Sequence, residues 1–140
     1  MMNARLLLID DVPDNLEFLA VLLRDTYDVF SFSSPGQAIT AFREIRPDLL
    51  LLDVRMSPIN GIDFLNHVRA IHGFRNIPAI AVTALAYEAE RQSFVSAGFQ
   101  AVVIKPIIDL KDLERVIASL LKKRFAILKD RSALYEQRAS

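Results

Sequence analysis

The sequence predicts an α/β fold, in which a doubly wound parallel sheet of five strands is flanked by five helices. Short apolar runs recur along the chain, and a segment with apolar residues at helical spacing follows each of them. Such strict alternation with short connections favours right-handed crossovers and helices on both faces of the sheet. The run Leu49–Leu52 consists of four leucines without a polar face, as in a strand buried on both sides. Among doubly wound folds, the strand order 2-1-3-4-5 suits a chain of 140 residues.

The first half of the chain contains three of the expected strands, Leu6–Ile9, Val29–Phe32 and Leu49–Asp53. Apolar residues at helical spacing predict a helix after the first strand and another after the second. Ser34 is the expected N-cap of the second helix, and Pro35 is its first residue. The inner faces of these two helices are expected to be Leu16, Leu19, Ala20 and Leu23, and Ala38, Ala41, Phe42 and Ile45.

The second half begins with the loop Val54–Gly61, which contains the turn formers proline, asparagine and glycine. The expected strands are Ala79–Val82, which finishes on Thr83, and Ala101–Ile104. A weaker helical pattern lies between them, and Gly98 is a plausible C-cap glycine for it. The expected helices are one with Ile62, Leu65, Val68 and Ile71 inward, one from about Tyr87 to Ala97, and one with Leu110, Leu113, Val116, Ile117 and Leu120 inward.

Composition limits the class of protein. The chain has 17 basic and 17 acidic residues, so its overall charge gives no reason to expect a nucleic-acid or membrane partner. It has no cysteine, which excludes disulfides, thiol chemistry and thiolate metal sites. No apolar run approaches the roughly 18 residues of a membrane span. We expect a cytoplasmic protein of one domain, with no membrane partner.

Polar side chains stand where the expected strands end. Asp10 and Asp11 follow the first strand, Asp53 ends the third, Thr83 the fourth, and Lys105 follows the fifth. In open α/β folds these ends meet at one edge of the sheet, where ligands bind. Three carboxylates there would repel one another unless a cation neutralised them, and Mg²⁺ prefers such oxygen ligands and also bridges to phosphate. A lysine and a hydroxyl beside them indicate phosphate chemistry.

Simpler interpretations exist for each residue taken alone. Aspartates commonly cap helices or form turns after strands, Thr83 could be an ordinary strand residue, and Lys105 an ordinary exposed lysine before a proline. All of them would then have to coincide at one sheet edge. His67 and His72 have no partner at a recognisable spacing, and we expect them at the surface.

The ordered set Asp10-Asp11, Asp53, Thr83-Ala84 and Lys105-Pro106 resembles the receiver domain of two-component response regulators, the CheY-like family. The resemblance covers about residues 5 to 121. It implies a flavodoxin-like fold and a response regulator that signals by conformational change. It also implies a sensor histidine kinase or a histidine phosphotransfer protein as partner. Such a protein is not an enzyme in the usual sense, because it promotes only its own phosphorylation and dephosphorylation.

The resemblance also assigns roles to residues. Asp53 matches the phosphoacceptor, which takes a phosphoryl group from a phosphohistidine. Asp11 and Asp53, with the backbone carbonyl of Arg55, would hold Mg²⁺, and Asp10 would act mainly through water. Thr83 and Lys105 would bind the phosphoryl oxygens. The phosphoryl-binding and switch set implied by the family is Thr83, Ala84, Lys105, Pro106 and Val102, and the Lys105–Pro106 bond resembles the family's cis peptide.

Two positions depart from the family pattern. A proline usually follows the methionine of the phosphoacceptor loop directly, but here Ser57 follows Met56 and the proline is Pro58. An aromatic residue usually stands three positions before the lysine and swings inward on activation, but this chain has Val102 there. A valine is too short for that movement. The alternative is therefore a degenerate receiver, which serves as an interaction or dimerisation module independent of phosphorylation.

Enzymes with related sites fit less well. A phosphatase of the haloacid-dehalogenase type would carry a second aspartate two residues after Asp53, where Arg55 stands. A flavodoxin would carry a Ser/Thr-rich phosphate loop after the first strand, where Asp10–Pro13 stands, and a P-loop is absent.

Residues 122–140 form a basic C-terminal extension beyond the expected receiver domain, residues 1–121. The extension has six basic residues and two acidic ones. Leu121, Phe125, Leu128 and Tyr135 continue a helical stripe. Three interpretations remain open for it: a longer last helix that forms a homodimer, a linker toward an output domain or protein outside this chain, or a frayed tail. Direct binding of nucleic acid is the least favoured.

Overall fold

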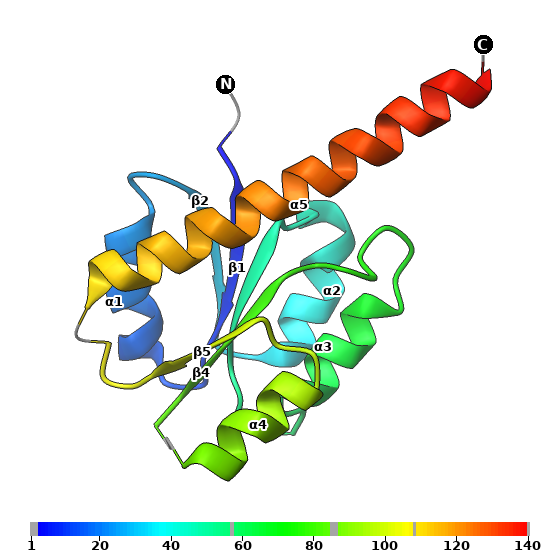
Figure 1. Ribbon diagram of the computed structural model, residues 1–140. Coiled ribbons are helices and arrows are strands. Elements are labelled where there is room, and N and C mark those ends of the chain that lie inside the picture. Colours follow the sequence, from blue (N-terminus) through cyan, green and yellow to red (C-terminus); the bar gives the residue numbers. More distant parts are fainter. Residues whose placement is uncertain (1–2, 57, 85–86, 108, 140) are drawn as a thin grey trace.

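A five-stranded parallel sheet runs through the centre of the protein, with helices on both of its faces (Figure 1). The computed structural model describes residues 3–56, 58–84, 87–107 and 109–139, and side chains up to residue 129. The strand order is β2-β1-β3-β4-β5, which confirms the predicted fold class and topology. The strands are β1 Arg5–Ile9, β2 Asp28–Phe32, β3 Leu49–Asp53, β4 Ala79–Thr83 and β5 Ala101–Ile104. The helices are α1 Pro13–Leu23, α2 Pro35–Ile45, α3 Gly61–Arg69, α4 Glu88–Ser96 and α5 Leu110–Ala139.

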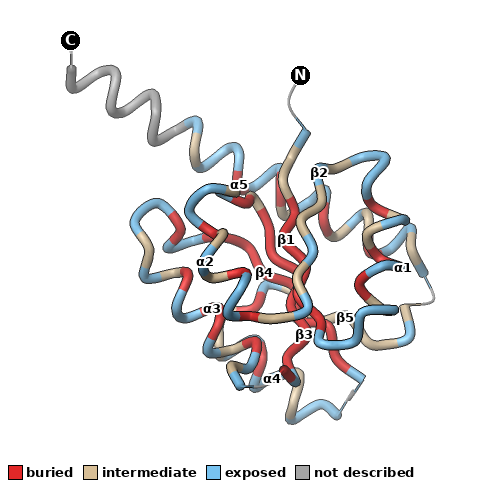
Figure 2. Tube along the Cα trace, turned by 180° about the vertical axis from the view of Figure 1, so that it is seen from behind, coloured by how far each residue is buried: buried red, intermediate tan, exposed pale blue. Residues whose placement is uncertain are grey.

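Strand β3 is buried on both faces, as the four leucines predict. None of them is more than 1% exposed. Side chains alternate across a strand, so Leu50 and Leu52 pack with residues of α2, α3 and α4, whereas Leu49 and Leu51 pack with residues of α1 and α5. Figure 2 shows the buried positions gathered along the central strands. Two apolar layers therefore fix the height and direction of β3, and with it the place of Asp53.

The local signals at helix ends are also present. The Ser34 hydroxyl accepts a hydrogen bond from the Gln37 N–H at 3.5 Å, so Ser34 is the N-cap of α2. Gly98, just after α4, has a φ of +106°, a conformation that favours glycine. The inner face of α3 differs from the prediction, because fully buried Phe64 lies at its centre while Ile62 is only partly buried. Ile71 lies beyond the end of that helix.

Helix α5 continues well past the sheet. Leu113, Ile117 and Leu121 are buried against the α1 side of the sheet. One turn later the Arg124 guanidinium lies 5.9 Å from the ring centroid of Phe74. The helix then projects away from the body, as the orange to red ribbon in Figure 1 shows. None of the helices in the described part of the chain is both long and apolar enough to cross a membrane.

The loop after β3 folds back closely onto the strand that it leaves. The Gly61 N–H donates a hydrogen bond to the Val54 carbonyl at 3.1 Å. A Cβ atom added at Gly61 would lie 2.8 Å from the Asp53 carbonyl oxygen and 3.0 Å from the Val54 Cα. Only a glycine allows this approach, so Gly61 holds the start of α3 against the end of β3. Ser57 of the same loop lies outside the described residues.

Substitution Gly61→Ala should therefore lower the free energy of unfolding by about 1–3 kcal/mol, because the methyl group meets backbone that has little room to move. Chemical denaturation measures the change. Gly36→Ala is the matched control, since its added Cβ meets no atom closer than 3.7 Å. That variant should keep or slightly raise stability by restricting the unfolded chain. Equal stability of the two variants would contradict the proposed role of Gly61.

Candidate functional site

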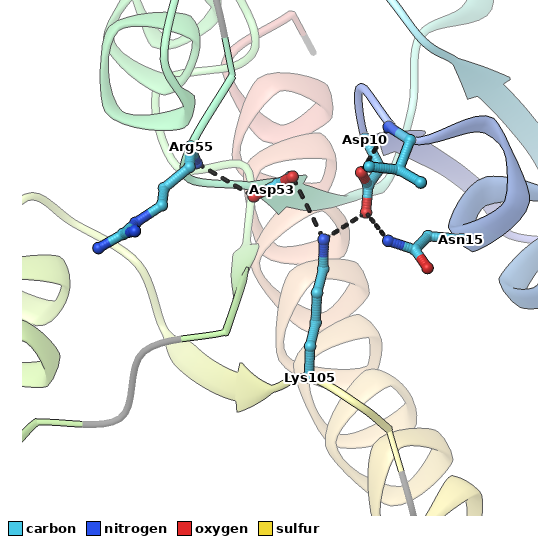
Figure 3. A network of polar contacts seen from close by, with 6 residues as sticks. Asp10, Asn15, Asp53, Arg55 and Lys105 are labelled. Atoms are coloured by element: carbon cyan, nitrogen blue, oxygen red, sulfur yellow. Dashed lines mark hydrogen bonds and ion pairs between the residues drawn. The ribbon is translucent and has the colours of Figure 1, made fainter.

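The sheet brings the predicted site residues to one edge. The register pairs Ile9 with Leu52 across β1 and β3, and Thr83 with Ile104 across β4 and β5. The carboxyl ends of these strands therefore stop at a similar height. Asp10 follows β1, Asp53 ends β3 and Lys105 follows β5, so their side chains point into the same space (Figure 3).

Three carboxylates form the acidic part of the site. Oxygen atoms of Asp10, Asp11 and Asp53 all lie within 4.8 Å of one another. Asp10 is 3% exposed and Asp53 7%, whereas Asp11 is exposed to solvent. Carboxylates removed from water need compensating positive charge or hydrogen bonds. The two buried members must therefore find both within the protein.

Lys105 supplies the compensating charge. Its ammonium nitrogen lies 2.6 Å from Asp10 Oδ2 and 3.2 Å from Asp53 Oδ2, as the dashed lines in Figure 3 show. Burial alone would lower the pKa of the Lys105 ammonium. The hydrogen bond to Asp10 and the charges of Asp53 and Asp10 outweigh burial, so the pKa is raised above its ordinary value. Lys105 is thus a cation shared by two carboxylates.

Asp53 is less well compensated. Burial raises the pKa of the Asp53 carboxyl above its ordinary value, and the charge of Asp10 adds to the rise. The Arg55 N–H, which donates to Asp53 Oδ1 at 3.0 Å, and the Lys105 ammonium oppose the rise without cancelling it. The ionised form of Asp53 is therefore destabilised in the folded protein, and additional positive charge at the site would stabilise it.

Asp10 is held by groups that the sequence does not reveal as site residues. Its Oδ1 accepts a hydrogen bond from the Val12 N–H at 2.9 Å. Its Oδ2 accepts one from the Asn15 side-chain amide at 3.4 Å, in addition to the Lys105 ammonium. The contact to Val12 is a turn that aspartates often make two residues onward. The contact to Asn15 depends on how α1 follows β1, which no sequence spacing signals.

The donor set fits a hard divalent cation. Three clustered carboxylates offer the oxygen ligands that Mg²⁺ prefers, and the exposed Asp11 leaves one side of the cluster open to solvent. The acidic site is thus compatible with magnesium binding. The individual ligand roles of Asp10, Asp11, Asp53 and the Arg55 carbonyl stay predictions.

The residues predicted to form the phosphoryl-binding and switch set lie on β4, on β5 and directly after these strands. Thr83 is 1% exposed, and its carbonyl accepts a hydrogen bond from the Lys105 N–H at 2.7 Å. Ala84 is exposed, and the Lys105–Pro106 peptide bond is cis. Val102 is half-buried and packs against the apolar layer on the α4 side. Phe99 is buried against Phe94 in that layer, so it does not take the place of the absent aromatic residue.

An open cleft of about 400 Å³ adjoins the site. Asp10 and Lys105 are its charged lining residues, and its other walls come from α1, from the end of β4 and from the segment after β5. The apolar and remaining lining residues are Asn15, Phe18, Leu19, Val82, Ala84, Pro106 and Ile107. A group that enters the cleft therefore meets the Lys105 ammonium beside the carboxylates.

The raised pKa of Asp53 predicts how the stability of the folded protein depends on pH. The folded protein binds the Asp53 proton more tightly than the unfolded chain, so ionisation of Asp53 destabilises the fold above the folded-state pKa. Asp53→Asn should therefore raise the unfolding temperature in metal-free buffer at pH 7. The gain should shrink as the pH falls and vanish below the ordinary carboxyl pKa, where Asp53 is neutral in both states.

Thermal unfolding between pH 3 and pH 7 measures this gain. Asp25→Asn is the control, because Asp25 is exposed in the turn after α1 and should give no such gain. A destabilised Asp53→Asn variant at neutral pH would show instead that the ion pair with Lys105 outweighs burial.

Comparisons with known proteins agree with this geometry. The family described as "Response regulator receiver domain" matches residues 6–118. The DNA-binding response regulator MtrA of Mycolicibacterium smegmatis is 35% identical over 120 residues, which cover 85% of this chain and 51% of MtrA. The cyclic di-GMP phosphodiesterase response regulator RpfG of Xanthomonas campestris is 30% identical over 142 residues, covering 98% of this chain and 37% of RpfG. The chain spans about half the length of MtrA and a smaller share of RpfG.

Solved structures show the same fold. One is the receiver domain of the sensor histidine kinase PA1611 from Pseudomonas aeruginosa, with a magnesium ion coordinated in its active site cleft. It is 27% identical, has a TM-score of 0.76, and the match covers 86% of this chain and 98% of that one. The family match spans the strands and the acidic cluster described above. This chain belongs to the response regulator receiver domain family of two-component systems.

Proposed function

We propose that this receiver is switched by phosphorylation and that Asp53 accepts the phosphoryl group from a phosphohistidine of a sensor kinase or phosphotransfer protein. The observation that carries the proposal is the position of Asp53. It ends a strand that is buried on both sides, its Oδ2 faces Lys105, and its Oδ1 faces the Arg55 N–H. A carboxylate fixed in this way, beside an open cleft, is a positioned nucleophile.

The transfer itself is a substitution at phosphorus. A carboxylate oxygen of Asp53 forms a bond to phosphorus while the bond from phosphorus to the imidazole nitrogen breaks. The electron pair of that bond stays on the imidazole, which becomes the neutral leaving group after proton exchange with solvent. The product on this chain is an aspartyl phosphate. Lys105 and Thr83 would receive the phosphoryl oxygens, Lys105 as a charge and Thr83 as a hydroxyl donor.

Charge explains why the site would change after the transfer. Asp11 and Asp53, with the Arg55 carbonyl, would hold Mg²⁺, and Asp10 would act mainly through water. The charge of the ion would offset the repulsion between the carboxylates and the incoming phosphoryl oxygens. Lys105 now divides its hydrogen bonds between Asp10 and Asp53. A phosphoryl group on Asp53 would add negative charge at the point that Lys105 faces. The ammonium would then shift toward it, and this shift would be the local start of the switch.

A degenerate receiver is the second candidate. It is favoured by Val102, which is half-buried against the α4-side layer and too short to move between buried and exposed positions as an aromatic ring does. This candidate would keep the fold and its surfaces without using the phosphoryl group. The two candidates differ in one measurable respect, which is whether Asp53 becomes phosphorylated.

Incubation with acetyl phosphate and Mg²⁺ should therefore add one phosphoryl group to the protein, labile to hydroxylamine. Intact mass measures it. Asp53→Asn should abolish the addition, whereas Asp25→Asn, an exposed control, should not. An unchanged mass of the unsubstituted protein would reject the phosphorylated receiver and leave the degenerate one.

Output is proposed to lie outside this chain. MtrA is described as DNA-binding and RpfG as a cyclic di-GMP phosphodiesterase, and each is about twice as long as the matched region or longer. Those activities are properties of the relatives. For this chain we propose a signal passed to an output domain or a partner protein, with no direct binding of nucleic acid.

The projecting part of α5 is proposed to pair with a second copy of the chain. Phe125 is 44% exposed, and Leu128, three residues later on the same side of the helix, is partly exposed, both on the part of α5 that follows Leu121. A helix that leaves the body with apolar side chains exposed gains stability by burying them against another helix. Side chains from Asp130 onward, Tyr135 included, lie outside the described residues.

Sedimentation should show self-association that the double substitution Phe125→Ser and Leu128→Ser weakens by about tenfold or more, since burying two such side chains contributes more than about 1.4 kcal/mol. Val21→Ser on α1 is the control, because Val21 is similarly exposed at 41%. A monomer at high concentration, with and without a phosphoryl mimic, would reject the pairing.

A further inference from the structure

The Asp10 carboxylate accepts hydrogen bonds from three donors, the Val12 N–H, the Asn15 amide and the Lys105 ammonium. It is 3% exposed, so both of its oxygens must be satisfied within the protein. Oδ1 is satisfied by the Val12 N–H at 2.9 Å. Oδ2 receives the Lys105 ammonium at 2.6 Å and the Asn15 amide at 3.4 Å. Oδ2 thus depends on one mobile cation and one neutral donor.

The two donors to Oδ2 differ in how freely they can leave. Lys105 carries its ammonium on a long side chain and already divides it between Asp10 and Asp53. Asn15 has a short side chain in the first turn of α1, where its N–H donates to the Val12 carbonyl at 3.1 Å. The helix therefore fixes the backbone from which this short side chain extends. Figure 3 shows the amide nitrogen directed at Asp10.

We infer that Asn15 is a positioning residue, which keeps Asp10 oriented when Lys105 turns toward the phosphoryl group. The inference rests on the proposed function, because only the transfer to Asp53 draws Lys105 away. Once the ammonium leaves Oδ2, Asn15 is the donor within the described contacts of Asp10 that still restrains this oxygen. Without it, the described contacts would restrain the Asp10 carboxylate through Oδ1 alone, by the Val12 N–H, and Oδ2 would follow Lys105.

The neutral charge of Asn15 matters as much as its hydrogen bond. The site already holds three carboxylates against one ammonium. An aspartate at position 15 would place a fourth carboxylate near Oδ2 of Asp10, raising the repulsion in metal-free protein and the attraction for a divalent cation. Leucine at position 15 has a similar shape but no donor. The two substitutions should therefore change magnesium binding in opposite directions, which a purely structural role would not produce.

Asn15 also lines the open cleft together with Phe18 and Pro106. Its amide lies beside Asp10, which lines the same cleft. A substitution there affects the reaction without touching Asp53, Asp11 or Lys105 directly. This separation allows the role of Asn15 to be tested while the acceptor remains intact.

The test measures magnesium binding through the rise of the unfolding temperature with Mg²⁺ concentration, and the initial rate of phosphoryl incorporation from acetyl phosphate. Asn15→Leu should need about fivefold more Mg²⁺ for half of the stabilisation, the effect of one neutral hydrogen bond, and should incorporate phosphoryl groups more slowly at saturating Mg²⁺. Asn15→Asp should unfold at a lower temperature without metal and need less Mg²⁺. Gln37→Leu, a substitution of an exposed amide on α2, should behave as the unsubstituted protein.

Asn15→Leu equal to Gln37→Leu in both measurements would overturn the inference, as would a shift of magnesium binding in the same direction in both Asn15 variants. If the unsubstituted protein binds Mg²⁺ but incorporates no phosphoryl group, the proposed function fails and the inference fails with it. Incorporation at equal rates in the unsubstituted protein and in Asn15→Leu, with equal magnesium binding, overturns the inference alone. If Mg²⁺ does not stabilise the unsubstituted protein, both are overturned.

Discussion

The ion pairs of Lys105 with Asp10 and Asp53 are the interaction on which the site depends. The sheet delivers both carboxylates to an edge where they are nearly shielded from water, and their mutual repulsion opposes that arrangement. Lys105, which directly follows β5, forms an ion pair with each of them. The apolar layers stabilise the strands, and the strands bring the charges together. The positive charge of Lys105 then offsets part of the repulsion between the carboxylates. The pKa of Asp53 stays raised, and the cluster keeps an excess of negative charge.

This excess links the fold to the proposed chemistry. A metal-free site that holds its carboxylates at a cost favours the binding of a cation. The same Lys105 that compensates the carboxylates is the charge that would be drawn to a phosphoryl group on Asp53. Asn15 and the Val12 N–H belong to this scheme as fixed partners of Asp10, because they need not move when Lys105 does. Asn15 and the Val12 N–H would thus keep Asp10 oriented, whereas Lys105 is the donor that would move.

Most of the fold was predictable, because it follows from short-range patterns. The four leucines of β3 identify a strand buried on both sides, and the Asp10, Asp53 and Lys105 positions follow from the rule that parallel strands end together. The inner face of α3 was less predictable. Phe64 and Ile62 are both apolar, and only the packing against the sheet decides that Phe64 is buried completely. Gly61 could be recognised as a turn residue, but its close approach to Asp53 depends on the three-dimensional path of the loop. The contact from Asn15 to Asp10 depends on how α1 is oriented relative to the end of β1, and no spacing reveals it. The position of Arg124 near Phe74 arises from packing between elements that are distant in sequence.

The departure from the family pattern at Val102 lies on the other side of the site from Asp10, against the α4-side layer. We expect it to affect how the state of the site is reported. The carboxylates, the ammonium and the cleft that the proposed transfer needs are all present. The central claim is that Asp53 itself accepts the phosphoryl group. Its most direct test treats the acetyl-phosphate-reacted protein with hydroxylamine and maps the resulting hydroxamate by peptide mass spectrometry. Asp53 should carry the hydroxamate, and no other aspartate should. A hydroxamate at Asp10 or Asp11, or none at all, would show that Asp53 is not the acceptor.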